Sequence, residues 1–328
     1  MGSRSQVMTV VLAALLTGGW SGSTPAQPYP NRNITIIIPS SAGGPGDVSA
    51  RLISERMSAI LGQTLIIETI AGAGGTIAMA RVAKAAPDGY TLMVHQVGFA
   101  ITPAIYAKLS FDTAKDFVTV GLVNQSSSFL VGRSDLPAKD FAELKAWMAG
   151  PGKPARYAHP GAGSSGHLQA VTLLRALGIE ASLVPYRGVA PALTDLLGGH
   201  IDITSAGSAL SVPLMRDGKV KAYATAGSRR DPEFPDIPTF GEVGYKRLER
   251  PFWHALFAPS ATPRPVLEIL NAALGETLND PQVIKAYKTT GVEAYPKEMW
   301  SLEAADAYIR GEMEVWAKAV RDNNVRLE

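Results

Sequence analysis

The stretch ITIIIPSSAGGPGDVSAR, residues 34–51, predicts a buried strand, a glycine-rich loop and the first turns of a helix. Residues 34–38 are mostly isoleucine, which suits a strand covered on both faces, and Pro39 ends that strand. The loop backbone is open to a ligand because three positions lack a side chain, Gly43, Gly44 and Gly46. Since free N–H groups and the positive dipole end of the helix face this loop, we expect it to attract an anion, a carboxylate as readily as a phosphate.

The composition is that of a globular protein with little net charge. The chain has 328 residues, of which 46% are apolar and 18% charged, and its formal net charge is +2. This length allows two compact domains, and the charge is too small to indicate a nucleic-acid partner. The absence of cysteine excludes disulfides and thiolate metal sites, and the histidines show no metal-ligand spacing.

The N-terminus has the three parts of an export signal. Arg4 is the basic end, residues 7–16 form an apolar core, and residues 21–26 are a small-residue cleavage region. The apolar core is short for a membrane span. We therefore expect a signal peptide over residues 1–26, cleaved near Ala26, and a periplasmic mature protein. The alternative is a disordered or anchored N-terminus.

Strands and helices alternate after the first loop, which predicts an open, largely parallel α/β sheet. Ligands bind beyond the carboxyl ends of the strands in such sheets. We therefore expect three polar or glycine-rich loops on one edge, at residues 41–46, 71–75 and 95–99.

A second α/β region follows, and the last helices have no sheet of their own. Residues 229–239 are typical of a surface connection, and residues 252–258 form a last apolar strand. The chain is therefore expected to return to the first domain, which gives two domains joined by more than one crossover. The predicted boundaries are 27–124 with 227–328 for domain 1 and 125–226 for domain 2.

The pattern Gly161-x-Gly163-x-x-Gly166 matches the dinucleotide fingerprint between a strand and a helix. That fingerprint also needs an acidic residue at the end of the next strand, where this chain has Tyr186 and Arg187. We therefore favour an anion-binding turn to which the hydroxyls of Ser164 and Ser165 contribute, and we expect no cofactor.

No glycine loop ends in the Gly-Lys-Ser/Thr of a P-loop, and neither serine of this turn lies in a GxSxG nucleophile elbow. The candidate loops are poor in Asp, Glu and Lys, which suits binding better than catalysis. Among single residues, Asp47 is interpreted as a first-turn carboxylate. Trp253 fits core packing and the cleft wall equally, and His254 is more often structural than a ligand contact.

Five groups of residues, taken in order, resemble one family. They are PSSAGGPGD at 39–47 with AR at 50–51, GAGG at 72–75 with AKAAPDGYTL at 83–92, GxGSSxHL at 161–168, VPYRG at 184–188 with PALTDLLGG at 191–199, and Trp253 with FAP at 257–259 and TP at 262–263. Together they resemble the Bug-type periplasmic receptors of tripartite tricarboxylate transporters.

The resemblance implies a type II periplasmic binding protein, a Venus flytrap of two α/β domains with a ligand cleft between them. It implies a monomeric, non-enzymatic receptor that holds a small carboxylate largely through backbone amides and delivers it to two integral membrane permease subunits. Loop 42–44 is expected to face loop 163–165. The candidate ligand-binding residues are Ser41, Ala42, Gly43, Gly44, Gln96, Gly98, Gly163, Ser164, Ser165, Tyr186, Ser205, Ala206, Trp253 and His254.

Three cleft positions depart from the family pattern: the pair Ser205-Ala206, the turn His95-Gln96, and His254. Family members often carry an aromatic-acid pair at the first of these, so its absence favours a ligand without an ammonium group. We hypothesise a carboxylate with a bulky or aromatic body that stacks near Trp253 or His254. An exported enzyme and a solute-sensing partner of a signalling protein are the alternatives.

Overall fold

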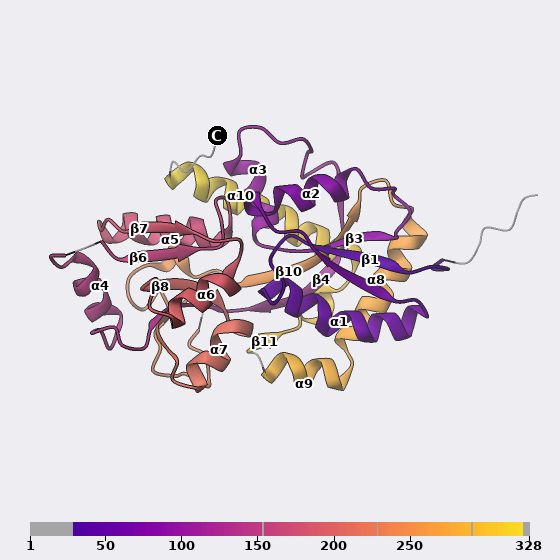
Figure 1. Cartoon of the computed structure of the whole chain (residues 1–328). Coiled ribbons are helices and arrows are strands. Elements are labelled where there is room, and N and C mark those ends of the chain that lie inside the picture. The colour runs from indigo at the N-terminus through magenta and orange to yellow at the C-terminus, as the bar shows by residue number, and fades with distance from the viewer. Residues whose placement is uncertain (1–28, 153, 228, 290, 324–328) are drawn as a thin grey trace, which may run out of the picture.

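The computed structural model describes residues 29–152, 154–227, 229–289 and 291–323. The molecule has two lobes side by side, each built on one sheet with helices on its faces (Figure 1). The predicted signal peptide, residues 1–26, lies outside the described residues.

The first lobe contains a six-stranded sheet in the order β11-β4-β10-β3-β1-β2. Its strands are β1 (Ile34–Ile38), β2 (Leu65–Thr69), β3 (Thr91–Gln96), β4 (Phe117–Ser126), β10 (Phe252–Pro259) and β11 (Val292–Glu293). Its helices are α1 (Pro45–Leu61), α2 (Thr76–Ala83), α3 (Gly98–Ile105), α8 (Arg264–Leu278), α9 (Pro281–Thr289) and α10 (Leu302–Asn323).

Strand β1 shows how this sheet is buried on both faces. Ile36 and Ile38 pack into a cluster with α1 and α8, whereas Ile37 packs into a second cluster with α2, α3 and α10. Successive side chains of a strand point to opposite faces, so a run of isoleucines fills both cores at once. The burial predicted for residues 34–38 is confirmed, since all four isoleucines are fully buried.

The second lobe contains a five-stranded sheet in the order β7-β6-β8-β5-β9. Its strands are β5 (Ser128–Arg133), β6 (Arg156–His159), β7 (Ser182–Pro185), β8 (Ile203–Gly207) and β9 (Val220–Thr225). Its helices are α4 (Phe141–Ala149), α5 (Ser165–Leu177), α6 (Val189–Leu197) and α7 (Ser208–Arg216).

The expectation of a largely parallel sheet is wrong, because both sheets are mixed. Strands β1, β2 and β3 pair in parallel, but β10 is antiparallel to β3 and β4. In the second lobe β5 is antiparallel to β8 and β9. Every antiparallel pair includes a strand that carries the chain between the lobes. An antiparallel pair does not need the crossover helix of a βαβ unit.

The chain passes between the sheets from β4 to β5 and again from β9 to β10. The segment before β10 packs on the second lobe, since Phe240 and Leu248 belong to its core. The boundaries drawn at 124/125 and 226/227 remain predictions.

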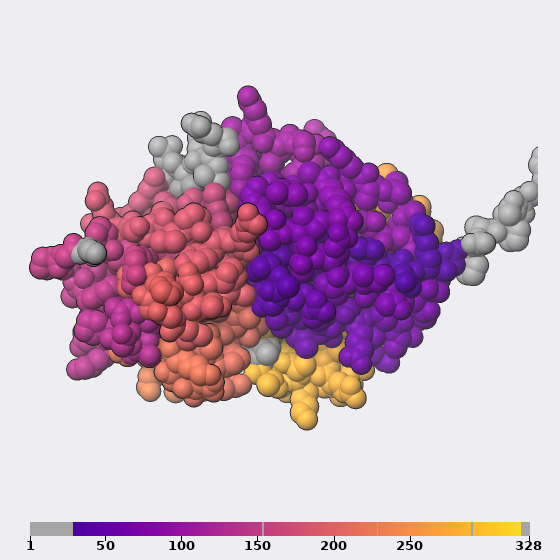
Figure 2. All heavy atoms as spheres, in the orientation of Figure 1, coloured from indigo at the N-terminus to yellow at the C-terminus, as the bar shows by residue number. Residues whose placement is uncertain are grey.

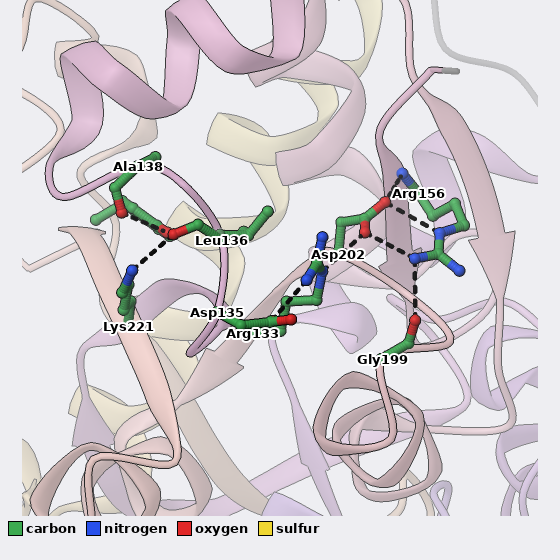
Figure 3. A network of polar contacts seen from close by, with 9 residues as sticks. Arg133, Asp135, Leu136, Ala138, Arg156, Gly199, Asp202 and Lys221 are labelled. Carbon is green, nitrogen blue, oxygen red and sulfur yellow. Dashed lines mark hydrogen bonds and ion pairs between the residues drawn. The ribbon is translucent and has the colours of Figure 1, made fainter. Parts of the chain in front are cut away.

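An ion-pair network stabilises the end of the second sheet where β6 and β8 begin and the antiparallel strand β5 ends (Figure 3). Asp202, just before β8, accepts hydrogen bonds from the backbone N–H and Nε of Arg156 at 2.8 and 3.0 Å and from Nε of Arg133 at 3.2 Å. Burial raises the pKa of Asp202, but these hydrogen bonds outweigh burial and hold it below its usual value. Nearby, Lys221 Nζ donates to the Leu136 carbonyl at 2.6 Å.

Among the described helices, none combines the length and apolarity that crossing a bilayer requires. Helix α10 is long enough, but charged residues recur along it.

Candidate functional site

A cavity of about 840 Å³ lies between the two lobes. Its walls come from the loops after β1, β2 and β3 in the first lobe and from the ends of β6, β7 and β8 in the second. These are the carboxyl ends of strands, where α/β sheets hold ligands. The three first-lobe loops therefore meet at one place.

Helix α1 begins at this cavity with unpaired backbone donors. Gly44 is its N-cap without a side-chain hydrogen bond, and Pro45 at the first position has no N–H to satisfy. The N–H groups of Gly46 and Asp47 find no acceptor in the part of the chain that the structure describes. Because Gly46 lines the cavity, this helix end offers donors and a positive dipole to an anion.

Helix α5 presents the same arrangement from the opposite lobe. Its N-cap Ser164 accepts the N–H of His167 at 3.2 Å and donates its hydroxyl to the Gly161 carbonyl at 2.6 Å. The next two N–H groups, of Ser165 and Gly166, have no acceptor among the described residues, and both residues line the cavity. Two helix N-termini, one from each lobe, thus open on the same space.

The lobes bond to each other beside the cavity. The Tyr106 hydroxyl of the first lobe lies 2.9 Å from the carbonyl oxygens of both Ala73 in its own lobe and Ala162 in the second. The Ser165 hydroxyl donates to Gln96 Oε1 at 3.2 Å. These contacts require the lobes to be closed.

Gly188 also lies on this seam. It packs so close to Ser41 of the other lobe that a Cβ at this position would collide with the serine hydroxyl. On the face shown in Figure 2, indigo atoms of the first lobe abut salmon atoms of the second along a continuous seam. The structure is therefore a closed form, in which the lobes touch at the rim of the cavity.

Basic side chains predominate on the cavity wall. Arg187, Arg247, Arg250 and Lys318 line it, whereas Asp322 is the acidic residue among the described lining residues. Lys318 pairs with Asp322 at 2.7 Å. The wall therefore carries positive charge, which adds to the two helix dipoles and favours an anionic ligand.

Aromatic and hydroxyl groups complete the wall. The aromatic rings are those of Tyr186, Phe252 and Trp316, and the serines include Ser40. The Ser40 hydroxyl is buried and has no partner among the described residues, and the Tyr186 hydroxyl donates to Asp195 at 2.6 Å. Apolar rings with a few polar groups are typical of a small-molecule site.

A family model described as "tripartite tricarboxylate transporter family receptor", TctC, matches residues 49–324. The chain belongs to the TctC family. The resemblance drawn from the five motifs is confirmed. TctC proteins are solute-binding receptors rather than enzymes, and this chain has their fold.

Three solved structures, one of them of the periplasmic binding protein BugD, are similar to this TctC-family chain over most of its length. BugD is 34% identical with a TM-score of 0.88, over 92% of this chain and 100% of that chain. MatC from Rhodopseudomonas palustris, solved with bound malate, is 36% identical with a TM-score of 0.85, over 89% and 100%. Rpa4515 from R. palustris, solved with adipate, is 28% identical with a TM-score of 0.83, over 91% and 99%.

The structure places the predicted site residues of this TctC-family receptor in three settings. Five line the cavity: Gln96, Ser164, Ser165, Tyr186 and Ser205. Seven stand outside the lining but within a few residues of it in sequence: Ser41, Ala42, Gly43, Gly44, Gly98, Gly163 and Ala206. Two are buried in the first lobe and do not line the cavity, although their neighbour Phe252 does: Trp253 and His254.

Trp253 is completely buried and packs in the core between β10 and α10. Its indole N–H donates to Glu312 at 2.8 Å, and the indole of Trp316 donates to the same carboxylate at 3.1 Å. The ring therefore fixes α10 on the sheet, and in this closed form a ligand has no access to it.

His254 is buried in a polar cluster of its own. Its Nδ1 lies 2.9 Å from Asn124 Oδ1 and 3.2 Å from Ser49 Oγ. Burial lowers its pKa to about 3, and burial together with His254 lowers the pKa of His95 to about 3 as well. Both rings are therefore neutral at physiological pH, and the Nε2 atom of each is buried without a partner among the described residues.

Sequence reasoning missed several lining residues. Ser40 and Arg187 belong to motifs that the sequence analysis recognised. Their position beside the predicted loops could have identified them as lining residues. Arg250 and Trp316 carry no such signal, because only the packing of α10 brings their distant segments together.

Gly43 contributes to the site through its backbone conformation. Its N–H donates to Asp47 Oδ2 at 2.8 Å, so this amide is occupied within the loop. Its φ of +73° is left-handed, and a Cβ there would meet nothing within 4 Å. We predict that Gly43→Ala lowers the free energy of unfolding by about 1 kcal/mol, because an L side chain is strained at this φ, as measured by urea denaturation.

Gly311 in α10 is the matched control. A Cβ there also meets nothing within 4 Å, but its backbone is helical and it lies inside α10. Gly311→Ala should therefore stabilise the protein by about 0.5–1 kcal/mol. Equal effects of the same sign at both positions would contradict the conformational explanation.

Proposed function

We propose that this protein captures a carboxylate between its lobes and delivers it to a membrane permease of the tripartite tricarboxylate type. The observation that carries the proposal is that α1 and α5, from different lobes, begin at one cavity with unpaired N–H groups. A carboxylate between them completes hydrogen bonds to both lobes and stabilises the closed form over an open one.

The wall chemistry supports a ligand without an ammonium group. The basic side chains and helix dipoles repel a cation, and Ser205, where relatives of this type often have an aromatic-acid pair, provides no carboxylate to hold one. The rings available to an aromatic or bulky body are those of Tyr186, Phe252 and Trp316. They take the place of Trp253 and His254 in the stacking hypothesis, because those two rings are buried elsewhere.

The relatives are consistent with this ligand class, since the two R. palustris proteins were solved with malate and adipate. We further propose a monomeric receptor that is exported to the periplasm after cleavage near Ala26, with hinges near residues 124/125 and 226/227. Its closed form docks on two integral membrane permease subunits.

A thermal-shift screen followed by isothermal titration tests the ligand class. The panel contains aliphatic mono- and dicarboxylates, aromatic carboxylates, amino acids and nucleotides. We expect carboxylates without an amino group to raise Tm and to bind with 1:1 stoichiometry, because ligand binding to the native state adds its free energy to stability. Binding of amino acids or nucleotides with no response to any simple carboxylate would contradict the proposal.

A further inference from the structure

One side chain joins the two lobes through a pair of backbone carbonyls. Tyr106 follows α3, and its hydroxyl oxygen lies 2.9 Å from the Ala73 carbonyl oxygen of its own lobe and 2.9 Å from the Ala162 carbonyl oxygen of the second lobe. Burial raises the pKa of Tyr106, so the hydroxyl keeps its proton at physiological pH. A phenol has a single O–H proton, and the two carbonyls therefore share one donor. We name this contact the clasp.

Two glycines, one from each lobe, make room for the clasp. A Cβ on Gly74 would collide with the Ala162 carbonyl oxygen and would lie 2.7 Å from the Tyr106 hydroxyl. A Cβ on Gly163 would lie 2.6 Å from Cε2 of the Tyr106 ring. The ring is able to turn aside, but the backbone carbonyl is not. A side chain at Gly74 would therefore hold the lobes apart.

The clasp is connected to the binding machinery through the turn before α5. Ala162 stands in this turn between Gly161, whose carbonyl accepts the Ser164 hydroxyl at 2.6 Å, and the N-cap Ser164 itself. Holding the Ala162 carbonyl therefore holds the start of α5 against the first lobe. Tyr106 does not line the cavity, so it acts on a ligand through this turn.

Opening the lobes leaves no donor of the clasp unsatisfied. Tyr106 keeps Ala73 as an acceptor within its own lobe, and the freed Ala162 carbonyl is exposed to water. One neutral hydrogen bond that replaces hydration changes an equilibrium constant by about two- to tenfold. A contact of this strength favours the closed form and still allows it to open for release.

We propose that Tyr106 is a positioning residue whose hydroxyl, in the space left by Gly74, holds the start of α5 in its closed position and so slows release of the ligand. This inference rests on the proposed function, in which α1 and α5 hold the ligand together. The clasp joins protein groups alone, so it forms without ligand and is tested on the ligand-free protein.

Cross-linking across the seam measures how often the lobes close. The chain contains no cysteine, so the double variant Q96C/S165C, which replaces two side chains that touch across the seam, carries the only two thiols. Dibromobimane becomes fluorescent once it joins two neighbouring thiols, which here requires the closed form. Because this bridging is slow beside domain motion, its rate reports the fraction of closed molecules.

In this background, Tyr106→Phe should lower the bridging rate about two- to tenfold with a nearly unchanged Tm. Gly74→Ala should lower it by about tenfold or more, because its Cβ meets a backbone oxygen of the other lobe. Gly62→Ala is the matched control. The φ of Gly62 is +66° against +62° at Gly74, but a Cβ there meets nothing within 4 Å, at the far end of α1. It should leave the rate unchanged, and melting curves verify that each variant is folded.

Equal bridging rates with tyrosine and phenylalanine at position 106 would overturn the proposal, as would equal rates in Gly74→Ala and Gly62→Ala. A parent pair that never bridges would also overturn it, because the clasp would then not form without ligand. None of these results touches the proposed function, which the carboxylate panel tests. Slower bridging in both clasp variants, with no carboxylate bound in that panel, would uphold the clasp as a device of closure and overturn the proposed function.

Discussion

Replacing Ser165 with aspartate should abolish ligand binding while leaving the protein fully folded. Ser165 is the first residue of α5 after its N-cap, and it lines the cavity. A carboxylate at this position satisfies the same unpaired N–H groups and dipole that we assign to the ligand. The helix accepts it readily, since an acidic residue in a first turn stabilises a helix by about 0.3–1 kcal/mol.

In the Ser165→Asp variant, the carboxylate of the ligand faces a fixed negative charge, whereas in the wild-type protein it faces N–H donors. Two like charges about 4 Å apart repel each other by roughly 4 kcal/mol at an effective dielectric constant near 20. We therefore expect Ser165→Asp to raise Kd by at least about 100-fold, as measured by isothermal titration, with an unchanged or slightly higher Tm.

Ser165→Asn is the control, because asparagine has nearly the shape of aspartate without its charge. It should raise Kd by less than about tenfold, through the altered contact with Gln96. If aspartate and asparagine weaken binding equally, the loss is steric and the electrostatic account of α5 is wrong.

Among the acidic residues with buried side chains, Asp202 should be the one whose replacement by alanine lowers the free energy of unfolding most. Its side chain is 8% exposed, whereas those of Arg156 and Arg133 are 42% and 24% exposed. Breaking a fully buried ion pair costs about 3–5 kcal/mol, and the access of both arginines to water reduces this. We expect Asp202→Ala to lower the free energy of unfolding by about 2–3 kcal/mol, as measured by urea denaturation.

Asp217→Ala serves as its control, because Asp217 pairs with Lys219 where both side chains are more than half exposed. That change should stay within about 0.5 kcal/mol. Similar losses at the two positions would show that burial of Asp202 contributes nothing.

The pH dependence of the Asp202 effect has a definite sign. Because the folded-state pKa of Asp202 is depressed, its contribution is complete above the ordinary aspartate pKa of about 3.9 and is lost as the pH falls through the depressed value. The stability difference between wild type and Asp202→Ala should therefore be constant near neutral pH and shrink below about pH 4. A difference that grows on acidification would contradict this assignment.

The sequence predicted well those elements whose local and long-range signals agree. The isoleucines of β1 are buried on both faces, and a helix follows the glycine loop from Pro45. The start of α5 after its glycine turn was found in the same way, since Ser164 is both an N-cap residue and part of a recognised motif.

Other elements were missed because their sequences contain residues that oppose them locally. Strand β4 includes Gly121, where a Cβ would lie 2.7 Å from Leu274 Cδ2, so the glycine is there for packing against α8. Helices α3 and α7 each contain an internal proline, Pro103 and Pro213. Tertiary contacts override local propensity at all three.

Lining residues were predicted only at the ends of strands or in the loops that follow them. Strand β10 is covered on both faces, so no alternation of polar and apolar residues shows which side chains face the cleft. Trp253 and His254 were therefore assigned to the cleft from the family resemblance and from their chemistry, and packing directs both into the lobe. The lining residues of α10, such as Trp316 and Lys318, reach the cavity only because the helix packs on the first lobe, and no local pattern encodes this packing.

A crystal structure of the protein with the tightest-binding carboxylate of the panel tests the central claim most directly. We predict one carboxylate of the ligand within hydrogen-bond distance of the Gly46 N–H at the start of α1 and of the Ser165 or Gly166 N–H at the start of α5. A ligand whose anionic groups are held by side chains alone, with both helix N-termini left to solvent, would contradict it.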